Sequence, residues 1–460
     1  MQPIEPQEEI TQLKAENAAL RAEVTSLKGL VAQLQEQVEE LGQPKRSVPA
    51  LVKPNRHATK RAPKAGKRKK RAAASNHGRR YEAATEIRVH AWEHCPDCGY
   101  KLSGQSVGRR RQVIDLPAIQ PVQVVEHQVR KRYCPHCAKW YEPKLDLRGE
   151  VLGQGRLGMR VMSLVAWLRT ELRLPVAMIQ RYLERLHGLK VSVGEIVELG
   201  HKVAQAGSDA IETIQQAICA SAQVHMDETV WRENGDNGYV WVASTTAGQR
   251  YYEYSLSRSG TVAEQILGAS FRGTLATDFY AGYNWYTGAH QRCWAHLLRD
   301  VHELDEGYGT AMPAVRAWVT QLTRTYLDGI ALVERAPPAR PLEREQLFQA
   351  LVARVRELGL QWARDKDHPA QALCKRLLRH DVELFQFVRQ AGLSAHNNLA
   401  ERSIRPLVIA RKVSGGTRSE QGSATRMRLQ TLFATWSAQG RNALAECLSI
   451  LGGEPFLPAV

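Results

Sequence analysis

The sequence predicts a multidomain protein of the mixed α/β class, and three patterns along the chain indicate this fold class. Leucines repeat every seven residues near the start, two C-x-x-C pairs lie further on, and alternating strand-like segments begin after Ala222. A chain of 460 residues is also too long for one ordinary hydrophobic core. We therefore expect several folded parts joined by linkers.

Residues 8–43 are predicted to form a parallel coiled coil that makes the chain a homodimer. Position d of the heptads is leucine throughout: Leu13, Leu20, Leu27, Leu34 and Leu41. Position a is β-branched apart from Asn17: Ile10, Val24, Val31 and Val38. This pattern favours two strands, and a buried asparagine fixes their register. One amphipathic helix packed on its own chain would explain the heptads, but not Asn17 or the opposite charges of pairs such as Glu9 with Lys14.

Residues 44–81 carry fourteen basic residues and no acidic one, in a chain whose formal net charge is +16. Such a composition predicts a disordered linker. Its densest cluster is suited to neutralise nucleic-acid phosphates, with a solvated tether as the alternative. This cluster is Lys67, Arg68, Lys69, Lys70 and Arg71. No apolar stretch approaches the roughly 20 residues that span a bilayer, and the acidic start is unlike a signal peptide, so we expect a cytoplasmic protein without a membrane partner.

Residues 82–150 are predicted to form a zinc ribbon. Two C-x-x-C pairs, Cys95 with Cys98 and Cys134 with Cys137, are separated by 35 residues. Four thiolates can close a tetrahedral Zn²⁺ site, and disulfides are the less favoured alternative in a reducing cytoplasm. The alternation of residues 122–133 predicts a strand that leads into the second pair.

Residues 151–217 have helical periodicity and are predicted to be a helical DNA-binding region. Two helical stretches, 176–186 and 193–203, flank a break at Gly188 and resemble a helix-turn-helix. Two helices packed together for structural reasons would give the same pattern, so base-specific recognition stays open here.

From Ala222 onward the chain predicts three antiparallel strands, a helix and a further strand. The strands are expected at 223–226, 238–245, 250–256 and 273–278, with a hairpin turn at 235–238 and the helix around 261–267. This order suits an α/β core of the ribonuclease H type.

Two aspartates, Asp227 and Asp278, are expected at strand ends, and Glu401 on a later helix. Phosphodiester cleavage with divalent metals needs carboxylates that hold two ions, Mg²⁺ or Mn²⁺, roughly 4 Å apart. Any one of these acids alone could be only a turn or cap residue. Glu228, next to Asp227, should point to the opposite side of the strand and is expected to be structural.

The motifs that surround these acids resemble those of the insertion sequence 66 family of transposases. The matching stretches are the two cysteine pairs, HMDET around Asp227, DFYAGY from Asp278, RCWAHLLRD from Arg292, and the run from Asn397 to Ser419. The resemblance covers nearly the whole chain. It implies a zinc-binding region, and a ribonuclease H-like catalytic domain whose Asp, Asp, Glu triad is split by a helical insertion.

Carried onto this sequence, the resemblance implies Asp227, Asp278 and Glu401 as the triad. The catalytic domain would span 218–430, with its insertion at about 305–393 and a helical tail over 431–460. Basic residues that follow the glutamate are expected to meet DNA phosphates. These residues are Arg402, Arg405, Arg411 and Lys412. Cys293 and His296 have C-x-x-H spacing, and a buried pair that supports the insertion is favoured over a second zinc site.

The function that the resemblance implies is cleavage at transposon ends followed by strand transfer into target DNA. Such a protein would be associated with the bacterial nucleoid, and accessory proteins of the same element could take part. The alternatives are a zinc-containing dimeric DNA-binding regulator that does not cut, and a nuclease that acts on RNA. Retention of all three acids in their motifs favours the enzyme.

Overall fold

The computed structural model describes residues 25–26, 82–104, 106–107, 109–336 and 338–453. The predicted coiled coil lies outside the described residues except for Thr25 and Ser26, which are helical, and the basic linker lies outside them entirely. The chain divides into two units, Met1–Asp115 and Leu116–Val460, each of which is described by itself. Within the described part, no helix is both long and apolar enough to cross a membrane.

The two cysteine pairs lie in short turns, one in each unit. In the first unit, the N–H of Gly99 donates to the Cys95 carbonyl at 2.9 Å, and Gly99 adopts a φ of +72°. In the second, a hairpin of β1 (Arg132–Cys134) and β2 (Lys139–Tyr141) carries the other pair in its turn. The predicted strand over 122–133 is therefore wrong for most of its length. The strand β1 begins only at Arg132, where its partner β2 ends at Tyr141. Beyond that residue, Pro143 lacks the N–H that would extend the pairing of the two strands.

Four helices precede the large sheet in the second unit. They are α2 (Met159–Thr170), α3 (Val176–His187), α4 (Val193–Ala206) and α5 (Ser208–Cys219). Gly188, with a φ of +66°, ends α3 in the left-handed conformation that favours glycine. The hydroxyl of Ser192 accepts the N–H of Glu195 and so caps the start of α4.

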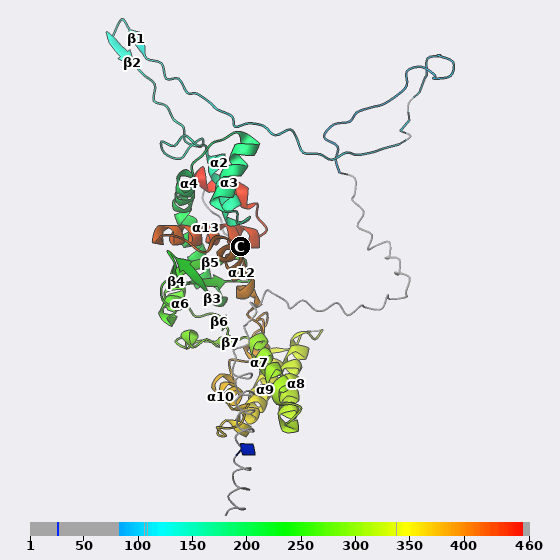
Figure 1. The fold of residues 1–460 in the computed structure, drawn as a ribbon, viewed down its shortest axis with the longest axis vertical. Coiled ribbons are helices and arrows are strands. Elements are labelled where there is room, and N and C mark those ends of the chain that lie inside the picture. The colour runs from blue at the N-terminus through cyan, green and yellow to red at the C-terminus, as the bar shows by residue number, and fades with distance from the viewer. Residues whose placement is uncertain (1–24, 27–81, 105, 108, 337, 454–460) are drawn as a thin grey trace, which may run out of the picture. The chain divides into compact units, whose positions relative to one another are not determined.

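The large sheet has the strand order β5-β4-β3-β6-β7 (Figure 1). Its strands are β3 (Gln223–Glu233), β4 (Asp236–Ser244), β5 (Arg250–Ser255), β6 (Thr274–Thr277) and β7 (His290–Arg292). β3, β4 and β5 form an antiparallel meander, while β6 pairs with β3, and β7 with β6, in parallel. Helix α6 (Gly260–Leu267) connects β5 to β6. The described part of the chain is thus of the mixed α/β class.

Two details of the first hairpin differ from the predictions. Asp227 does not end the first strand, because β3 continues to Glu233 and stays paired with β4 over that length. The turn is Asn234 and Gly235 rather than 235–238, since Glu233 pairs with Asp236. Both turn residues have positive φ, +51° and +97°, as a two-residue type I′ turn requires.

The two faces of the sheet bury different helices. One face, with Met226 and Trp241, joins a core shared with α2, α4, α5, α6 and the C-terminal helices α13 (Glu420–Ala438) and α14 (Ala443–Leu451). The other face, with Trp231 and Val242, packs mainly against α12 (Asn398–Ser414). Helix α13 crosses the predicted boundary between the catalytic domain and a tail at residue 431, and it packs along β5.

A helical body with its own core follows β7 (Figure 1). It consists of α7 (Trp294–Tyr308), α8 (Pro313–Val333), α9 (Pro341–Trp362), α10 (Gln371–His380) and α11 (Gln386–Arg389). The helices begin at Trp294, earlier than the predicted insertion at about 305. The N–H of Trp294 donates to the Ala395 carbonyl at 3.0 Å, so the two ends of this body meet beside the sheet.

Candidate active site

Asp227, on β3, and Asp278, directly after β6, occupy matching positions relative to two neighbouring strands. β3 and β6 run parallel, and their last paired residues are His225 and Ala276. Each aspartate lies two residues beyond this pair, so both carboxylates come to the same edge of the parallel part of the sheet. The Asp227 carboxylate accepts the N–H of Glu228 at 2.9 Å, and that of Asp278 accepts the N–H of Tyr280 at 2.9 Å.

Glu401 is brought to the same place by the start of α12. It lies in the first turn of that helix, where a negative charge interacts favourably with the helix dipole. The turn is held against the sheet by the preceding Asn397, whose side-chain Nδ2 donates to the Met226 carbonyl at 2.7 Å. The structure therefore brings all three predicted acids together, although 122 residues separate Asp278 from Glu401.

The electrostatics of Asp227 reflect this cluster of acids. The pKa of the Asp227 carboxyl is raised to about 7, chiefly by burial and in addition by the nearby charges of Glu228, Asp278 and Glu401. The N–H of Glu228 opposes the shift. Like charges so close together favour protonation of one acid or binding of a cation.

Glu228 is engaged on the other side of β3. Its side chain is 2% exposed and accepts hydrogen bonds from Arg258 at 2.7 Å and from the Tyr283 hydroxyl at 2.6 Å. Burial raises the pKa of the Glu228 carboxyl, whereas these two partners lower it. Arg258 and Tyr283 thus hold the Glu228 carboxylate, and its structural role stays a prediction.

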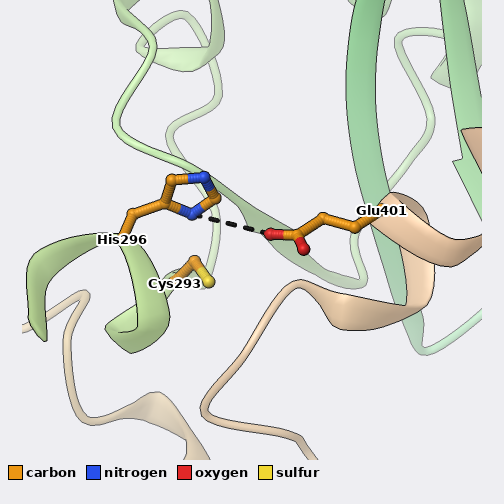
Figure 2. A group of neighbouring side chains, drawn as sticks. All are labelled: Cys293, His296 and Glu401. Atoms are coloured by element: carbon orange, nitrogen blue, oxygen red, sulfur yellow. Dashed lines mark ion pairs between the residues drawn. The ribbon is translucent and has the colours of Figure 1, made fainter. Parts of the chain in front are cut away.

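Cys293 and His296 lie beside Glu401 (Figure 2). Cys293 immediately precedes α7 and is buried, and His296 is in the first turn of that helix. The His296 Nδ1 atom is 3.8 Å from Glu401 Oε1. Burial raises the pKa of the Cys293 thiol, but interactions with His296, His396 and the N–H of Asn397 outweigh burial and lower that pKa to about 6. The sequence predicted that Cys293 and His296 form a buried pair that supports the insertion. It did not predict that this pair lies close to Glu401.

Two polar residues around the acids were missed by the sequence analysis. Asn397 is 1% exposed, and its Oδ1 accepts a hydrogen bond from the Nδ1 of His225 at 3.2 Å. Arg292 is also 1% exposed and donates to the Asp278 carbonyl at 2.8 Å. The sequence around them gave little signal, because Arg292 lies in the all-polar run His290–Arg292 and Asn397 in the polar run before α12.

The basic residues predicted to meet DNA lie along α12. Arg402, Arg405 and Lys412 are exposed. Arg411 is half-buried, and its guanidinium donates to the Val230 carbonyl on β3. The predicted basic cluster at 67–71 lies outside the described residues.

The cysteine pairs have local geometry that suits zinc. Backbone N–H groups of Cys98 and Asp97 lower the pKa of the Cys95 thiol, and the N–H of Cys137 does so for Cys134. Such hydrogen bonds favour the thiolates that bind zinc. The single four-cysteine site stays a prediction, since the pairs belong to separate units.

The acid cluster offers ligands for hard divalent cations. Carboxylate oxygens are the donors that Mg²⁺ and Mn²⁺ prefer. Asp227, Asp278 and Glu401 supply such oxygens from three different parts of the chain. Burial first, and then the neighbouring acids, raise the pKa of Asp227, and a bound cation would stabilise its ionised form. The three acids therefore fit a site for these ions.

Comparisons with known families match two parts of the chain. Residues 154–425 match the model described as "Transposase IS66 family". Residues 93–138 match the model described as "zinc-finger binding domain of transposase IS66". The first match contains all three acids, and the second contains all four paired cysteines.

Two similar proteins come from Sinorhizobium fredii. The uncharacterized protein y4qI is 29% identical over 194 residues, which are 38% of this chain and 35% of that protein. The uncharacterized protein y4jO is 28% identical over 153 residues, which are 33% of this chain and 45% of that protein. The similarity thus spans less than half the length of either relative.

Proposed function

Because this chain belongs to the IS66 family of transposases, which the match over residues 154–425 establishes, we propose that it cuts and joins DNA. The proposed reactions are hydrolysis of a phosphodiester at each transposon end and attack of the freed 3′ hydroxyl on a phosphodiester of target DNA, which displaces the target's own 3′ oxygen. The proposed triad is Asp227, Asp278 and Glu401. The observation that carries this assignment is the matched position of the two aspartates, each two residues beyond the pair His225 and Ala276.

The topology supports a ribonuclease H-like catalytic domain. Three antiparallel strands are followed by a helix and two strands parallel to the first, in the order β5-β4-β3-β6-β7. The acids lie on the first strand, after the fourth, and on a helix that packs across one face of the sheet. A helical body between the second and third acids supports the proposed insertion.

The residues of the site have separable tasks in the proposed reactions. Asp227, Asp278 and Glu401 would hold the divalent ions, Mg²⁺ or Mn²⁺. When bound, such ions make the attacking oxygen more nucleophilic and stabilise the leaving oxygen. Arg292 holds the backbone carbonyl of Asp278, and Asn397 holds that of Met226, the residue before Asp227. Exposed Arg402 and Arg405 are placed to neutralise DNA phosphates near the acids.

Zinc and dimerisation belong to the same proposal. Cys95, Cys98, Cys134 and Cys137 would hold one structural Zn²⁺, which the match of residues 93–138 to a zinc-finger family supports. The basic segment over 44–81 would bind DNA without sequence preference, and the heptads over 8–43 would pair two chains.

The test is cleavage and joining of a labelled DNA fragment that carries the ends of the element, with magnesium and purified full-length protein. We expect products with the wild type and none with Asp278→Asn, while DNA affinity stays within about twofold. The matched control is Asp236→Asn, an exposed aspartate in the β3–β4 hairpin, which should cleave as the wild type does.

Two other outcomes contradict parts of the proposal. Binding without cleavage by the wild type would favour a DNA-binding regulator. Unchanged cleavage by Asp278→Asn would remove this residue from the triad.

A further inference from the structure

Three side chains of different chemistry converge at the junction of α7 and α12 (Figure 2). The Sγ of Cys293, a ring nitrogen of His296 and a carboxylate oxygen of Glu401 all lie within 4.8 Å of one another. Cys293 and His296 come from the start of α7, and Glu401 from the first turn of α12. The cluster therefore includes the third acid of the proposed triad together with a thiol and an imidazole.

Two atoms of this cluster are buried without a hydrogen bond. His296 Nδ1 and Glu401 Oε1 have no hydrogen-bond partner among the described residues. Their separation of 3.8 Å is too long for a direct hydrogen bond. It is close to the spacing of two ligands on one tetrahedral zinc ion, about 3.3–3.8 Å for bonds of about 2.0–2.3 Å. Both atoms would be satisfied by one cation between them.

The ligand set selects the class of cation. Thiolate and imidazole are ligands of Zn²⁺ and similar thiophilic ions, whereas Mg²⁺ prefers oxygen ligands alone. Three protein ligands also leave a fourth tetrahedral position for water. The cluster is thus chemically distinct from a site made of Asp227, Asp278 and Glu401.

The backbone around the cluster is fixed in advance. The N–H of Asn397 donates to Cys293 Sγ at 3.1 Å, and the Asn397 side chain is bonded to β3. Cys293 is 1% exposed, so its thiol cannot turn toward solvent without moving the start of α7. Ligands held in this way lose little conformational entropy when they bind an ion.

We propose that Cys293, His296 and Glu401 form an inhibitory site for a thiophilic divalent cation such as Zn²⁺. The inhibitory role rests on the proposed function, because it requires Glu401 to belong to the catalytic triad. Zinc bound here would engage the Glu401 carboxylate and place two positive charges beside the magnesium site. Both effects weaken magnesium binding, the second through repulsion between cations. The Cys293 thiol releases its proton when the ion binds.

Zinc binding is measured first, on full-length protein dialysed against buffered zinc without DNA. We expect the wild type to hold one more zinc ion per chain than Cys293→Ser or His296→Ala. In Cys293→Ser, the serine hydroxyl keeps an acceptor for the Asn397 N–H. In His296→Ala, the side chain that is removed is 31% exposed. The two variants therefore disturb folding in different ways. The matched control is Cys374→Ser, a buried cysteine of the helical body whose hydrogen bond to the Leu358 carbonyl serine can keep. Equal zinc content in all four proteins would overturn the site.

Inhibition is measured second, as the concentration of added zinc that halves magnesium-dependent cleavage, relative to the activity of each protein without added zinc. We expect this concentration to rise at least about tenfold in both site variants and to stay unchanged in Cys374→Ser. Equal inhibition of all proteins would mean that zinc acts at the acids themselves, and it would overturn the inhibitory role. Absence of cleavage by the wild type without added zinc would refute the proposed function and with it the inhibitory role. The zinc count decides the existence of the site independently.

Discussion

The Nδ2 of Asn397 donates a hydrogen bond of 2.7 Å to the carbonyl of Met226, the residue before Asp227. The same amide accepts from His225, which burial keeps neutral by lowering its pKa to about 4. One asparagine therefore ties the start of α12 to the centre of β3. Because Glu401 lies in the first turn of α12, directly after Asn397, this contact sets the position of one acid relative to another.

Replacing Asn397 with alanine should lower the cleavage rate about 10- to 100-fold, because Glu401 loses its fixed position. The change should also reduce the free energy of unfolding by about 1–3 kcal/mol, since the buried Met226 carbonyl is left unsatisfied. Single-turnover cleavage at several magnesium concentrations and urea denaturation measure the two effects. We expect a higher magnesium requirement with unchanged DNA affinity. Asn398→Ala, at the exposed neighbouring position, is the control. Equal rates for both variants would remove the positioning role.

The raised pKa of Asp227 predicts a pH-dependent loss of stability without added magnesium. In the unfolded chain this carboxyl ionises near 3.8, and in the folded chain near 7. Between these values the folded state binds the extra proton, so its stability should fall as pH rises from about 4 to about 7. Above pH 7 the effect is complete. Urea denaturation of the wild type and of Asp227→Asn over this pH range isolates the contribution of Asp227. The asparagine variant should lack the fall in the free energy of unfolding that this carboxyl causes. Parallel curves for the two proteins would contradict the assigned pKa.

The place of Asp278 directly after a strand could be predicted from local pattern, whereas the assignment of both aspartates to a triad came from family resemblance. Alternation of apolar residues locates the strands, and an acid at the end of an apolar run stands out. Local pattern did not locate the hairpin turn between β3 and β4, because the sequence offers two suitable turns. Asn234-Gly235 and Asn237-Gly238 are both suitable hairpin turns, and only pairing of the whole β3–β4 ladder selects the first.

The surroundings of Glu401 could not be predicted from local pattern. The contact of Asn397 with Met226 joins residues 171 positions apart, and that of Asn397 with Cys293 joins residues 104 positions apart. Such contacts depend on how the helical body returns the chain to the sheet. Family resemblance supplied the identity of Glu401, whereas its proximity to Cys293 and His296 required the structure.

Zinc content can decide whether the two cysteine pairs share one ion. If all four thiolates bind one Zn²⁺, then Cys98→Ser and Cys137→Ser should each lose one ion per chain. The double variant should lose the same ion and no more. Elemental analysis of dialysed full-length protein measures this, with the half-buried Cys219→Ser as the control. Loss of two ions by the double variant would mean that each pair binds its own metal.

Arg292 is predicted to be the most sensitive basic residue near the acids. Its buried guanidinium bonds the Asp278 carbonyl, Glu383 at 2.7 Å and Asn284 at 2.6 Å. Alanine here should reduce the free energy of unfolding by about 3–5 kcal/mol, because Glu383 loses its guanidinium partner and is left with His380 alone among the described residues. Lysine should rescue little, since one ammonium cannot make the three divergent contacts. Arg316→Ala, which removes a more exposed ion pair with Asp305, should cost less than about 1 kcal/mol. Urea denaturation of the three variants measures their losses in free energy of unfolding. An Arg292→Lys variant as stable as the wild type would mean that the divergent contacts of the guanidinium are not needed.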